Sequence, residues 1–597
     1  MLLRFLLLTY ALCVSAVFFS PKSSRGNHHP REYLPQKATN LRRNATATTV
    51  ASSPTGTPCT GNSAEDRSQW CDYDIDTDWS SVVPDTGVTR EYWLQLDEIA
   101  VAPDGYLRTA IAINGYIPGP TLFADWGDWV VIHVTNNLHE AKNGTSIHWH
   151  GIWQRGSNDH DGVVSITQCA SAPGTTQTYR WRAMQYGSSW YHSHIGLQAW
   201  EGVYGGIIIN GPATANYDDD AGMMILSDWT HRTADSLFHE AQTCGPPLPD
   251  NGLINGTNIY ATRSGNETNV DGSRLKVKVE PGKSTRIRLL NAALDSHFKF
   301  SIDNHRMTVI AMDFVPVKPF DTYAIDIAMG QRYDLVITAD QAAVADSFWI
   351  RAVPLSVCSE NARQHNIRGI LHYNTKPSLP STQPYFYLDD ECNDIPASQL
   401  IPHVPKTVLP PDWQNTTSAV TRPNSDGFFR WYLNSTTMEV FWDNPTLLQL
   451  QNGSTSSHFP PSSAVISLPD AHRWVYLDIE TRMPIPHPIH LHGHDFFILA
   501  QGHGAWDGVA KTHNPPRRDT AMLPANGHLV VAFETDNPGA WLMHCHIGWH
   551  TTEGFALQFL ERVEEISGVD YGGLREMCEA WVAYDERFDI DQEDSGV

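Results

Sequence analysis

The sequence predicts an all-β protein built from several β-sandwich domains. Many short β-branched runs are separated by turn residues, and long helical periodicity is missing outside short stretches near the C-terminus. The chain also contains 38 Pro and 20 Trp, which suit a β-rich fold with many turns better than a helical bundle. A length of 597 residues is too great for one hydrophobic core and favours three or four domains.

Short strands with Gly and Pro between them are typical of repeated β-sandwiches. Examples of predicted strands are Trp129 to Val134, Tyr204 to Ile209, Leu275 to Val279, Arg286 to Leu290, Arg332 to Ile337 and Leu529 to Phe533. Asn210-Gly211-Pro212 predicts a first boundary, and the Pro- and Asp-rich segment from Leu379 to Pro411 predicts a linker. We therefore expect domains over residues 59–212, 213–385 and 386–597.

The N-terminus has the pattern of a secretory signal over residues 1–18. Arg4 is the only charge before the mostly apolar run from Phe5 to Leu12, and small residues follow. This run is too short to span a bilayer, which needs about 20 residues, so we do not expect a membrane anchor. Residues 19–58 are interpreted as a pro-segment or flexible arm. The sequence thus predicts a secreted, extracellular protein.

Charge and cysteine content agree with an extracellular location. The formal net charge of -25 argues against a nucleic-acid partner, because phosphate binding needs a basic face. Of nine cysteines, Cys13 leaves with the signal and Cys545 lies between two histidines. The other seven allow three disulfides and one spare thiol in an oxidising compartment. Possible glycosylation sequons occur at Asn44, Asn143, Asn255, Asn266, Asn415, Asn434 and Asn452.

Histidines occur in H-x-H pairs near both ends of the chain. The pairs are His148/His150, His192/His194, His490/His492, His492/His494 and His544/His546. On a β-strand, residues i and i+2 face the same side, so each pair directs two imidazoles to one place. Imidazole nitrogen is a good ligand for copper and zinc. One pair alone would be ordinary, but the set predicts several metal ions held between two domains.

The motif His544-Cys545-His546 predicts a second kind of metal site. Strand alternation places the thiol on the side opposite the two histidines. Together with His487 and His550, Cys545 forms a His₂Cys set, the ligand chemistry of a blue-copper electron-transfer site. Zinc explains this set less well, since it has no redox chemistry. Electrons that enter at the cysteine centre could pass from Cys545 through its neighbours His544 and His546 to the histidine cluster.

Phe555 lies ten residues after Cys545, where an axial neighbour of the metal is expected. Phenylalanine cannot donate to copper, and a weaker ligand field favours Cu(I). We therefore expect a higher reduction potential than a methionine would give. Plain core packing of Phe555 is compatible with this interpretation.

The four histidine motifs together resemble the copper-binding motifs of multicopper oxidases. The motifs are His148-Trp149-His150-Gly151, Trp190-Tyr191-His192-Ser193-His194, the segment His487 to His494, and the segment His544 to His550. The resemblance runs from about residue 70 to the C-terminus. It implies three cupredoxin-like Greek-key β-sandwich domains and four copper ions.

The same resemblance assigns each metal ligand by motif position. The type-1 copper would be held by His487, Cys545 and His550, and the type-2 copper by His148 and His490. The type-3 pair would be held by His150, His192, His194, His492, His544 and His546. His494 closes its motif without being a ligand and is expected to have a structural role.

Two further motifs resemble the ascomycete-type laccases. These are the segment from Asn514 to Asp519 and the terminal segment from Asp594 to Val597. In that group the C-terminal tail plugs a channel to the trinuclear copper cluster, which gives Val597 a role beside the cofactor. A frayed acidic tail is the alternative from charge alone. Phe555 departs from the group, which more often has Leu there.

The resemblance also implies disulfides and acidic site residues. The expected disulfides are Cys59–Cys71, Cys169–Cys578 and Cys358–Cys392, which leave Cys244 unpaired. Asp161 resembles an acid that assists proton delivery to the cluster, although an Asp-Gly turn explains its spacing equally well. Asp250 and Glu267 flank Leu253-Ile254-Asn255-Gly256, and either could accept a phenol proton or be only a loop acid.

The resemblance implies a monomeric laccase that oxidises phenolic and related aromatic reductants and reduces dioxygen to water. The natural substrate, whether lignin phenols, pigment precursors or plant toxins, stays open. One alternative is a ferroxidase, which needs acidic residues beside the type-1 site, and whose fungal members carry a membrane anchor. Others are an ascorbate or bilirubin oxidase, or a catalytically silent copper-binding protein, which loss of Cys545 would mark.

Overall fold

The computed structural model describes residues 59–139, 144–260, 271–373, 377–384, 392–588 and 590. The predicted signal over residues 1–18, the arm over residues 19–58, Glu267 and Val597 lie outside the described residues. No helix in the described part of the chain is long and apolar enough to cross a membrane.

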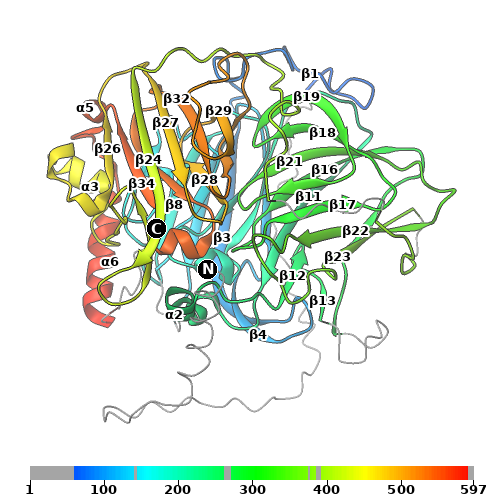
Figure 1. Ribbon diagram of the computed structural model, residues 1–597, viewed down its shortest axis with the longest axis horizontal. Coiled ribbons are helices and arrows are strands. Elements are labelled where there is room, and N and C mark those ends of the chain that lie inside the picture. Colours follow the sequence, from blue (N-terminus) through cyan, green and yellow to red (C-terminus); the bar gives the residue numbers. More distant parts are fainter. Residues whose placement is uncertain are drawn as a thin grey trace, which may run out of the picture.

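The described chain is mostly β-strand, arranged as three pairs of sheets (Figure 1). The first pair has the strand orders β4-β3-β6-β8 and β5-β10-β9-β7. Its strands are β3 (Thr89–Val101), β4 (Arg108–Ile113), β5 (Gly119–Asp125), β6 (Trp129–Asn136), β7 (His148–His150), β8 (Thr176–Arg182), β9 (Gly187–His192) and β10 (Tyr204–Asn210). In each pair, apolar side chains fill the space between the sheets.

The second pair, drawn green in Figure 1, has the orders β12-β11-β16-β21-β18-β19 and β15-β23-β22-β17-β20. Its strands are β11 (Asp219–Trp229), β12 (Asn251–Ile254), β15 (Lys276–Lys278), β16 (Ser284–Asn291), β17 (Phe298–Ile302), β18 (Met307–Met312), β19 (Val315–Thr322), β20 (Ile325–Ile327), β21 (Arg332–Thr338), β22 (Ser347–Pro354) and β23 (Arg368–His372).

The third pair, drawn yellow to red, has the orders β25-β24-β27-β32-β29-β30 and β26-β34-β33-β28-β31. Its strands are β24 (Trp413–Pro423), β25 (Phe429–Leu433), β26 (Val465–Leu468), β27 (Trp474–Thr481), β28 (His487–Leu491), β29 (Phe496–His503), β30 (Arg517–Arg518), β31 (Thr520–Leu523), β32 (Gly527–Glu534), β33 (Gly539–Cys545) and β34 (Ala556–Glu561).

Short elements complete the chain. The remaining strands are β1 (Gln69–Trp70), β2 (Tyr73–Asp74), β13 (Ile259–Tyr260) and β14 (Asp271–Gly272). The helices are α2 (Ala234–Cys244), α3 (Thr446–Gln451), α4 (Gly548–Thr552), α5 (Val563–Ile566) and α6 (Leu574–Phe588), and the 3₁₀ turns are η1 (Asn158–His160), η2 (Gln198–Glu201), η3 (Ser456–His458) and η4 (Pro461–Ser463). Helix α2, with 11 residues, lies far from the C-terminus in a segment where the sequence showed no long helical periodicity. Thr233 caps its start by accepting a hydrogen bond from the backbone N–H of Ser236.

The six strands chosen from the sequence are all confirmed, with bounds that differ by only a few residues. The predicted boundary at residues 212/213 falls in the gap between β10 and β11. The boundary at residues 385/386 lies outside the described residues, so the division into domains stays a prediction.

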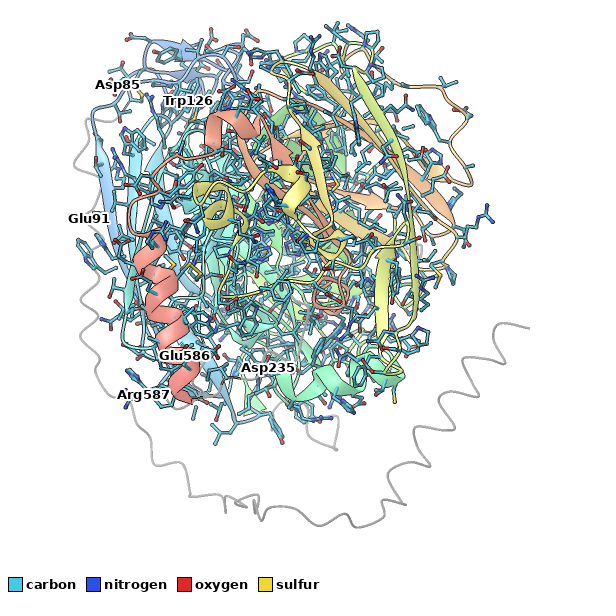
Figure 2. All side chains as sticks on the ribbon, turned by 90° about the vertical axis from the view of Figure 1, so that its left-hand side faces the viewer. Asp85, Glu91, Trp126, Asp235, Glu586 and Arg587 are labelled. Carbon is cyan, nitrogen blue, oxygen red and sulfur yellow. A yellow bond between two sulfur atoms is a disulfide. The ribbon has the colours of Figure 1, made fainter. Side chains whose placement is uncertain are left out.

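The expected disulfides Cys59–Cys71, Cys169–Cys578 and Cys358–Cys392 are confirmed. The Cys169–Cys578 disulfide connects α6 to the part of the chain that forms the first pair of sheets. In Figure 2, α6 lies beside the strands of this pair, and Glu586 and Arg587 lie near the end of the helix. The expectation that Cys244 is unpaired is wrong, because Cys244 is disulfide-bonded. Within the described chain, Cys545 is the free cysteine, and it is buried.

Candidate metal centre

The cysteine centre forms inside one sheet of the third pair. Strand β28 pairs with β33, which places Ile489 opposite Cys545, and α4 then turns His550 back toward the thiol. The Cys545 Sγ lies 3.6 Å from Nδ1 of His550 and 3.8 Å from Nδ1 of His487. The two Nδ1 atoms are 3.2 Å apart. The three predicted ligands therefore surround one buried point at which a metal ion would fit.

Phe555 lies beside this centre, as its position in the sequence suggested. Its ring is 5.0 Å from the His487 ring and 5.1 Å from the Trp431 ring, between centroids. The backbone N–H of Cys545 donates to the carbonyl oxygen of Phe555 at 3.0 Å. Phe555 thus packs against the centre without presenting a donor atom to it.

Without a metal, burial disfavours the charged forms of the three side chains at the cysteine centre. Burial raises the pKa of the Cys545 thiol, and the nearby charges of Asp295 and Glu553 act in the same direction. Burial lowers the pKa of His550 to about 3 and that of His487 well below its usual value. The imidazoles are therefore neutral, as metal ligands must be, and a bound cation would stabilise the thiolate.

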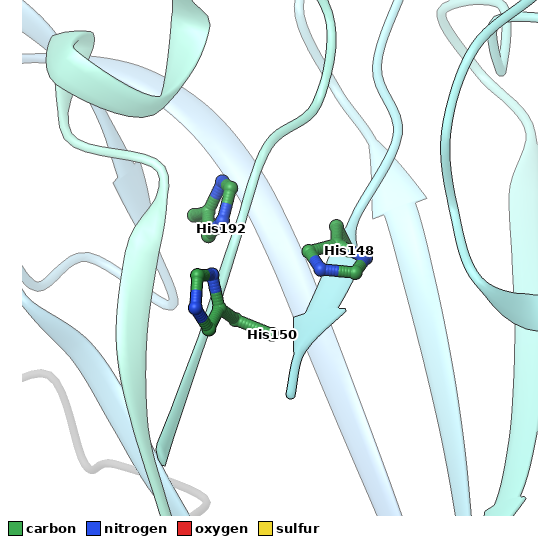
Figure 3. Close-up of side chains that lie close together, drawn as sticks. All are labelled: His148, His150 and His192. Carbon is green, nitrogen blue, oxygen red and sulfur yellow. The ribbon is translucent and has the colours of Figure 1, made fainter. Parts of the chain in front are cut away.

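Eight histidines meet between the first and third pairs of sheets. In the first pair, β7 pairs with β9 so that His148 lies opposite His192. In the third, the pairing of β28 with β33 places His490 opposite His544. The groups His148/His150/His192, His148/His490/His492 and His194/His492/His544 each have ligand atoms within 4.8 Å of one another. Figure 3 shows the first group, with His150 and His192 adjacent and His148 across from them.

His546 completes this histidine cluster. Its ring centroid lies 5.1 Å from that of His150 and 5.5 Å from that of His192. All eight imidazoles are at least 95% buried. The structure thus brings together every histidine that the sequence assigned to the type-2 and type-3 positions.

In most of these imidazoles, one ring nitrogen forms a hydrogen bond within the protein, and the other has no hydrogen-bond partner among the described residues. The Nδ1 atoms of His148 and His490 donate to the carbonyl oxygens of Asp161 and Asp519, each at 2.8 Å. The Nδ1 atoms of His192 and His544 likewise contact the carbonyl oxygens of Ser193 and Cys545. The Nε2 atoms of all four histidines are buried without a partner among the described residues. This fixes the tautomer and leaves a lone pair for a metal.

Asp161 contacts two histidines of the cluster. Its Oδ2 lies 2.8 Å from Nδ1 of His492, and its Oδ1 lies 3.2 Å from Nδ1 of His148. The carboxylate is fully buried. Asp161 therefore lies at the cluster, and its role in proton delivery stays a prediction.

His150 is held in the opposite orientation. Its Nε2 contacts Oδ1 of Asp519 at 3.1 Å and Oγ1 of Thr520 at 3.3 Å, so its Nδ1 is the unpaired atom. Asp519 also accepts two hydrogen bonds from Arg332, at 2.6 and 2.7 Å. Asp519 was not singled out as a site residue, although it closes the segment from Asn514 to Asp519. Its partner His150 is 369 residues away, so no local signal marks the contact.

The second pair of sheets contributes none of the predicted ligands, yet it reaches the cluster. Arg332 stands at the start of β21, and Gly330 lies just before it. Gly330 has φ +83, and a Cβ atom there would lie 2.9 Å from His546 and 3.1 Å from His150. Only glycine allows this close approach of the backbone to both imidazoles.

Two further residues singled out from the sequence, His494 and Asp250, contact other groups. His494 Nε2 lies 3.0 Å from Oε2 of Glu561, which agrees with a structural role. Asp250 is 41% exposed and accepts a hydrogen bond from the backbone N–H of His231 at 2.8 Å.

A buried His₂Cys set beside a cluster of eight histidines defines a multicopper protein. Three family models described as multicopper oxidase match residues 95–214, 220–376 and 439–565. The chain therefore belongs to the multicopper oxidase family, and copper is its cofactor.

Similar proteins narrow this class. Laccase-2 of Botryotinia fuckeliana is 44% identical over 90% of this chain and 93% of its own length. Laccase-1 of Melanocarpus albomyces is 40% identical over 88% of this chain and 87% of its own length. The crystal structure of the laccase from Botrytis aclada has a TM-score of 0.85 at 42% identity, and covers 90% of this chain and all of that one. These likenesses show an ascomycete-type laccase with cupredoxin-like β-sandwich domains, as the motifs suggested.

Proposed function

We propose that the laccase activity of this chain uses four copper ions. One would be held by His487, Cys545 and His550, and one by His148 and His490. The other two would be held by His150, His192, His194, His492, His544 and His546. Copper at these positions supplies one-electron oxidation of a phenol-like reductant and four-electron reduction of dioxygen to water.

The observation that carries this proposal is the set of unpaired ring nitrogens. Seven of the eight cluster histidines have a buried Nε2 without a partner among the described residues, and His150 has such an Nδ1. Burying so many unpaired polar atoms is costly unless a ligand occupies the space between them. Neutral imidazoles that surround a common space suit copper ions well.

The protein's own groups position and shield the two centres. His544 and His546 flank Cys545 along one backbone segment, so a short covalent path joins the centres. Trp431 and Phe555 cover the cysteine centre and exclude water from the thiol. Asp161 and Asp519 hold imidazoles of the cluster in fixed orientations.

The proposal extends to the substrate side. Small phenolic or aromatic reductants and dioxygen are the expected partners, and the protein is expected to be a secreted monomer. Asp250 and Glu267 stay predictions for the acid that accepts the phenol proton. The C-terminal plug at Val597 likewise stays a prediction.

A steady-state assay of the purified holoprotein tests the proposal. Oxygen uptake is recorded with a phenol, with ferrous iron and with ascorbate, and copper is counted per chain. We expect four copper ions and the highest kcat/KM with the phenol. The iron-import multicopper oxidase Fet3p has a TM-score of 0.74 at 25% identity to this chain. A clear preference for ferrous iron would therefore replace the proposal with the ferroxidase alternative.

A further inference from the structure

A cavity of about 360 Å³ lies between the first and third pairs of sheets. Its rim carries two ion pairs, Lys406 with Asp78 and Arg155 with Asp536, whose side chains are 27–35% exposed. Its wall also includes Trp153, Gly493, Asp495 and Arg517, of which Asp495 is half-buried and the other three are buried. The cavity therefore leads from a solvent-facing rim to a buried end.

The buried end is made from segments that continue the ligand motifs. Gly493 directly follows His492, and Trp153 comes three residues after His150. Asn537 joins these two segments, because its side-chain amide donates to the carbonyl oxygens of Trp153 and Gly493 at 2.7 and 2.9 Å. Two residues of the cavity wall therefore belong to the same chain segments as the cluster residues His150 and His492.

Several buried polar atoms around the cavity lack partners within the described chain. They are Nε1 of Trp153, Nε of Arg155, Nε of Arg517 and both carboxyl oxygens of Asp495. Polar cavities hold ordered water, whereas apolar cavities of similar size stay dry. At about 30 Å³ for each water molecule, this cavity has room for several.

Asp495 differs from the other carboxyl groups of this cavity. Asp78 and Asp536 have cationic partners, whereas neither carboxyl oxygen of Asp495 has a hydrogen-bond partner of good geometry in the described chain. Its pKa is raised to about 7, first by burial and then by the charge of Asp519.

The other groups facing Asp495 do not reverse this effect. Trp153, Arg517 and Arg332 lower its pKa, but burial outweighs them. His494 is engaged with Glu561, and Lys406 with Asp78. Asp495 can therefore both hold and release a proton near neutral pH.

We propose that Asp495 relays protons from water in this cavity toward the histidine cluster during the reduction of dioxygen. The proposal rests on the laccase function above. Each dioxygen takes up four electrons and four protons to give two waters. Asp495 breaks one O–H bond when it releases a proton inward and forms one when water in the cavity returns a proton. The residue is thereby unchanged after each transfer and needs no further reactant.

The test compares Asp495→Asn with the matched variant Asp78→Asn, which removes a carboxylate from the rim of the same cavity. Both holoenzymes should bind full copper, stay blue and be reduced by a phenol at the wild-type rate without oxygen. Reoxidation by dioxygen should slow about 100-fold in Asp495→Asn only, the scale of a lost acid–base group.

The pH profile separates a relay from a structural role. Below pH 7 the Asp495 carboxyl is protonated, and above pH 7 it becomes ionised. The reoxidation rate of the wild type should therefore fall as pH rises through about 7. This inflection should be absent from Asp495→Asn. An unchanged rate and an unchanged inflection in that variant would overturn the relay.

Two controls keep the outcome interpretable. If Asp495→Asn loses copper, Asp495→Glu is measured instead. An Asp495→Glu variant with full copper content must retain the inflection, and its absence there overturns the relay.

A wild-type holoprotein that stays blue but consumes no oxygen with a phenol contradicts the proposed function, and the relay with it. If the wild type turns over normally and the reoxidation rate of Asp495→Asn is unchanged, only the relay is contradicted.

Discussion

The two centres of this molecule are built in different ways. The cysteine centre takes His487, Cys545 and His550 from one sheet and the helix that follows it. The histidine cluster takes imidazoles from two pairs of sheets and is braced by Arg332 of a third. The first centre therefore depends on local strand register, and the second on how distant parts of the chain pack. Substitutions should be able to damage either centre while sparing the other.

The largest expected effect is that of Cys545→Ser, which removes the cysteine centre. Hydroxyl oxygen is a poor substitute for the thiolate ligand, so the strong blue absorption should vanish and oxygen uptake with a phenol should fall to background. The histidine cluster should keep its copper, because none of its ligands changes. Absorption spectra and copper content check this result, and a variant that remains blue would refute the ligand assignment.

The converse variant is Arg332→Met, which should damage the histidine cluster and spare the cysteine centre. It leaves the buried Asp519 carboxylate without its ion-pair partner, a loss that typically costs about 3–5 kcal/mol. The Tm should fall and copper should be lost from the cluster, while blue absorption persists.

Arg306→Met is the matched control for that variant. Its ion pair with Asp321 is solvent-exposed, at 63% and 41%, so removing it should change the free energy of unfolding by less than about 1 kcal/mol. Electron paramagnetic resonance and copper analysis distinguish the two centres. Equal copper content in Arg332→Met and the wild type would mean that the cluster does not depend on this brace.

The smallest effect is expected from Phe555→Met, which refines the cysteine centre without breaking it. A thioether beside the copper would stabilise Cu(II), so the reduction potential should fall while the blue absorption and copper content stay unchanged. Phe555→Leu adds no donor and should leave the potential close to that of the wild type. Redox titration checks both variants, and an unchanged potential in Phe555→Met would show that the side chain does not approach the metal.

The sequence predicted the fold class and the convergence of the motif histidines well, because both depend on short-range periodicity. Alternation along a strand directs His544 and His546 to one side and Cys545 to the other, and the structure has this arrangement. Disulfides followed from the family resemblance, but the pairing of Cys244 did not. Helix α2 was missed because its apolar pattern is weak and its start depends on the cap at Thr233.

Residues that act across long distances in the chain could not be predicted. The contacts of Asp519 with His150 and Arg332 span 369 and 187 residues, and no local pattern records either contact. Asp161 could be placed only through the family, because its two histidine partners come from opposite ends of the chain. Asp495 lies next to a recognised motif, but its lack of a partner follows from packing alone.

The close approach of Gly330 to His150 and His546 has a consequence for protein engineering. The middle sheets look like an interchangeable module, since they contribute none of the predicted ligands. Any side chain at position 330 would nevertheless push on two imidazoles from different sheets. A chimera that imports this module from another oxidase must therefore retain the glycine at that turn, or the grafted part will distort the histidine cluster to which it contributes no predicted ligand.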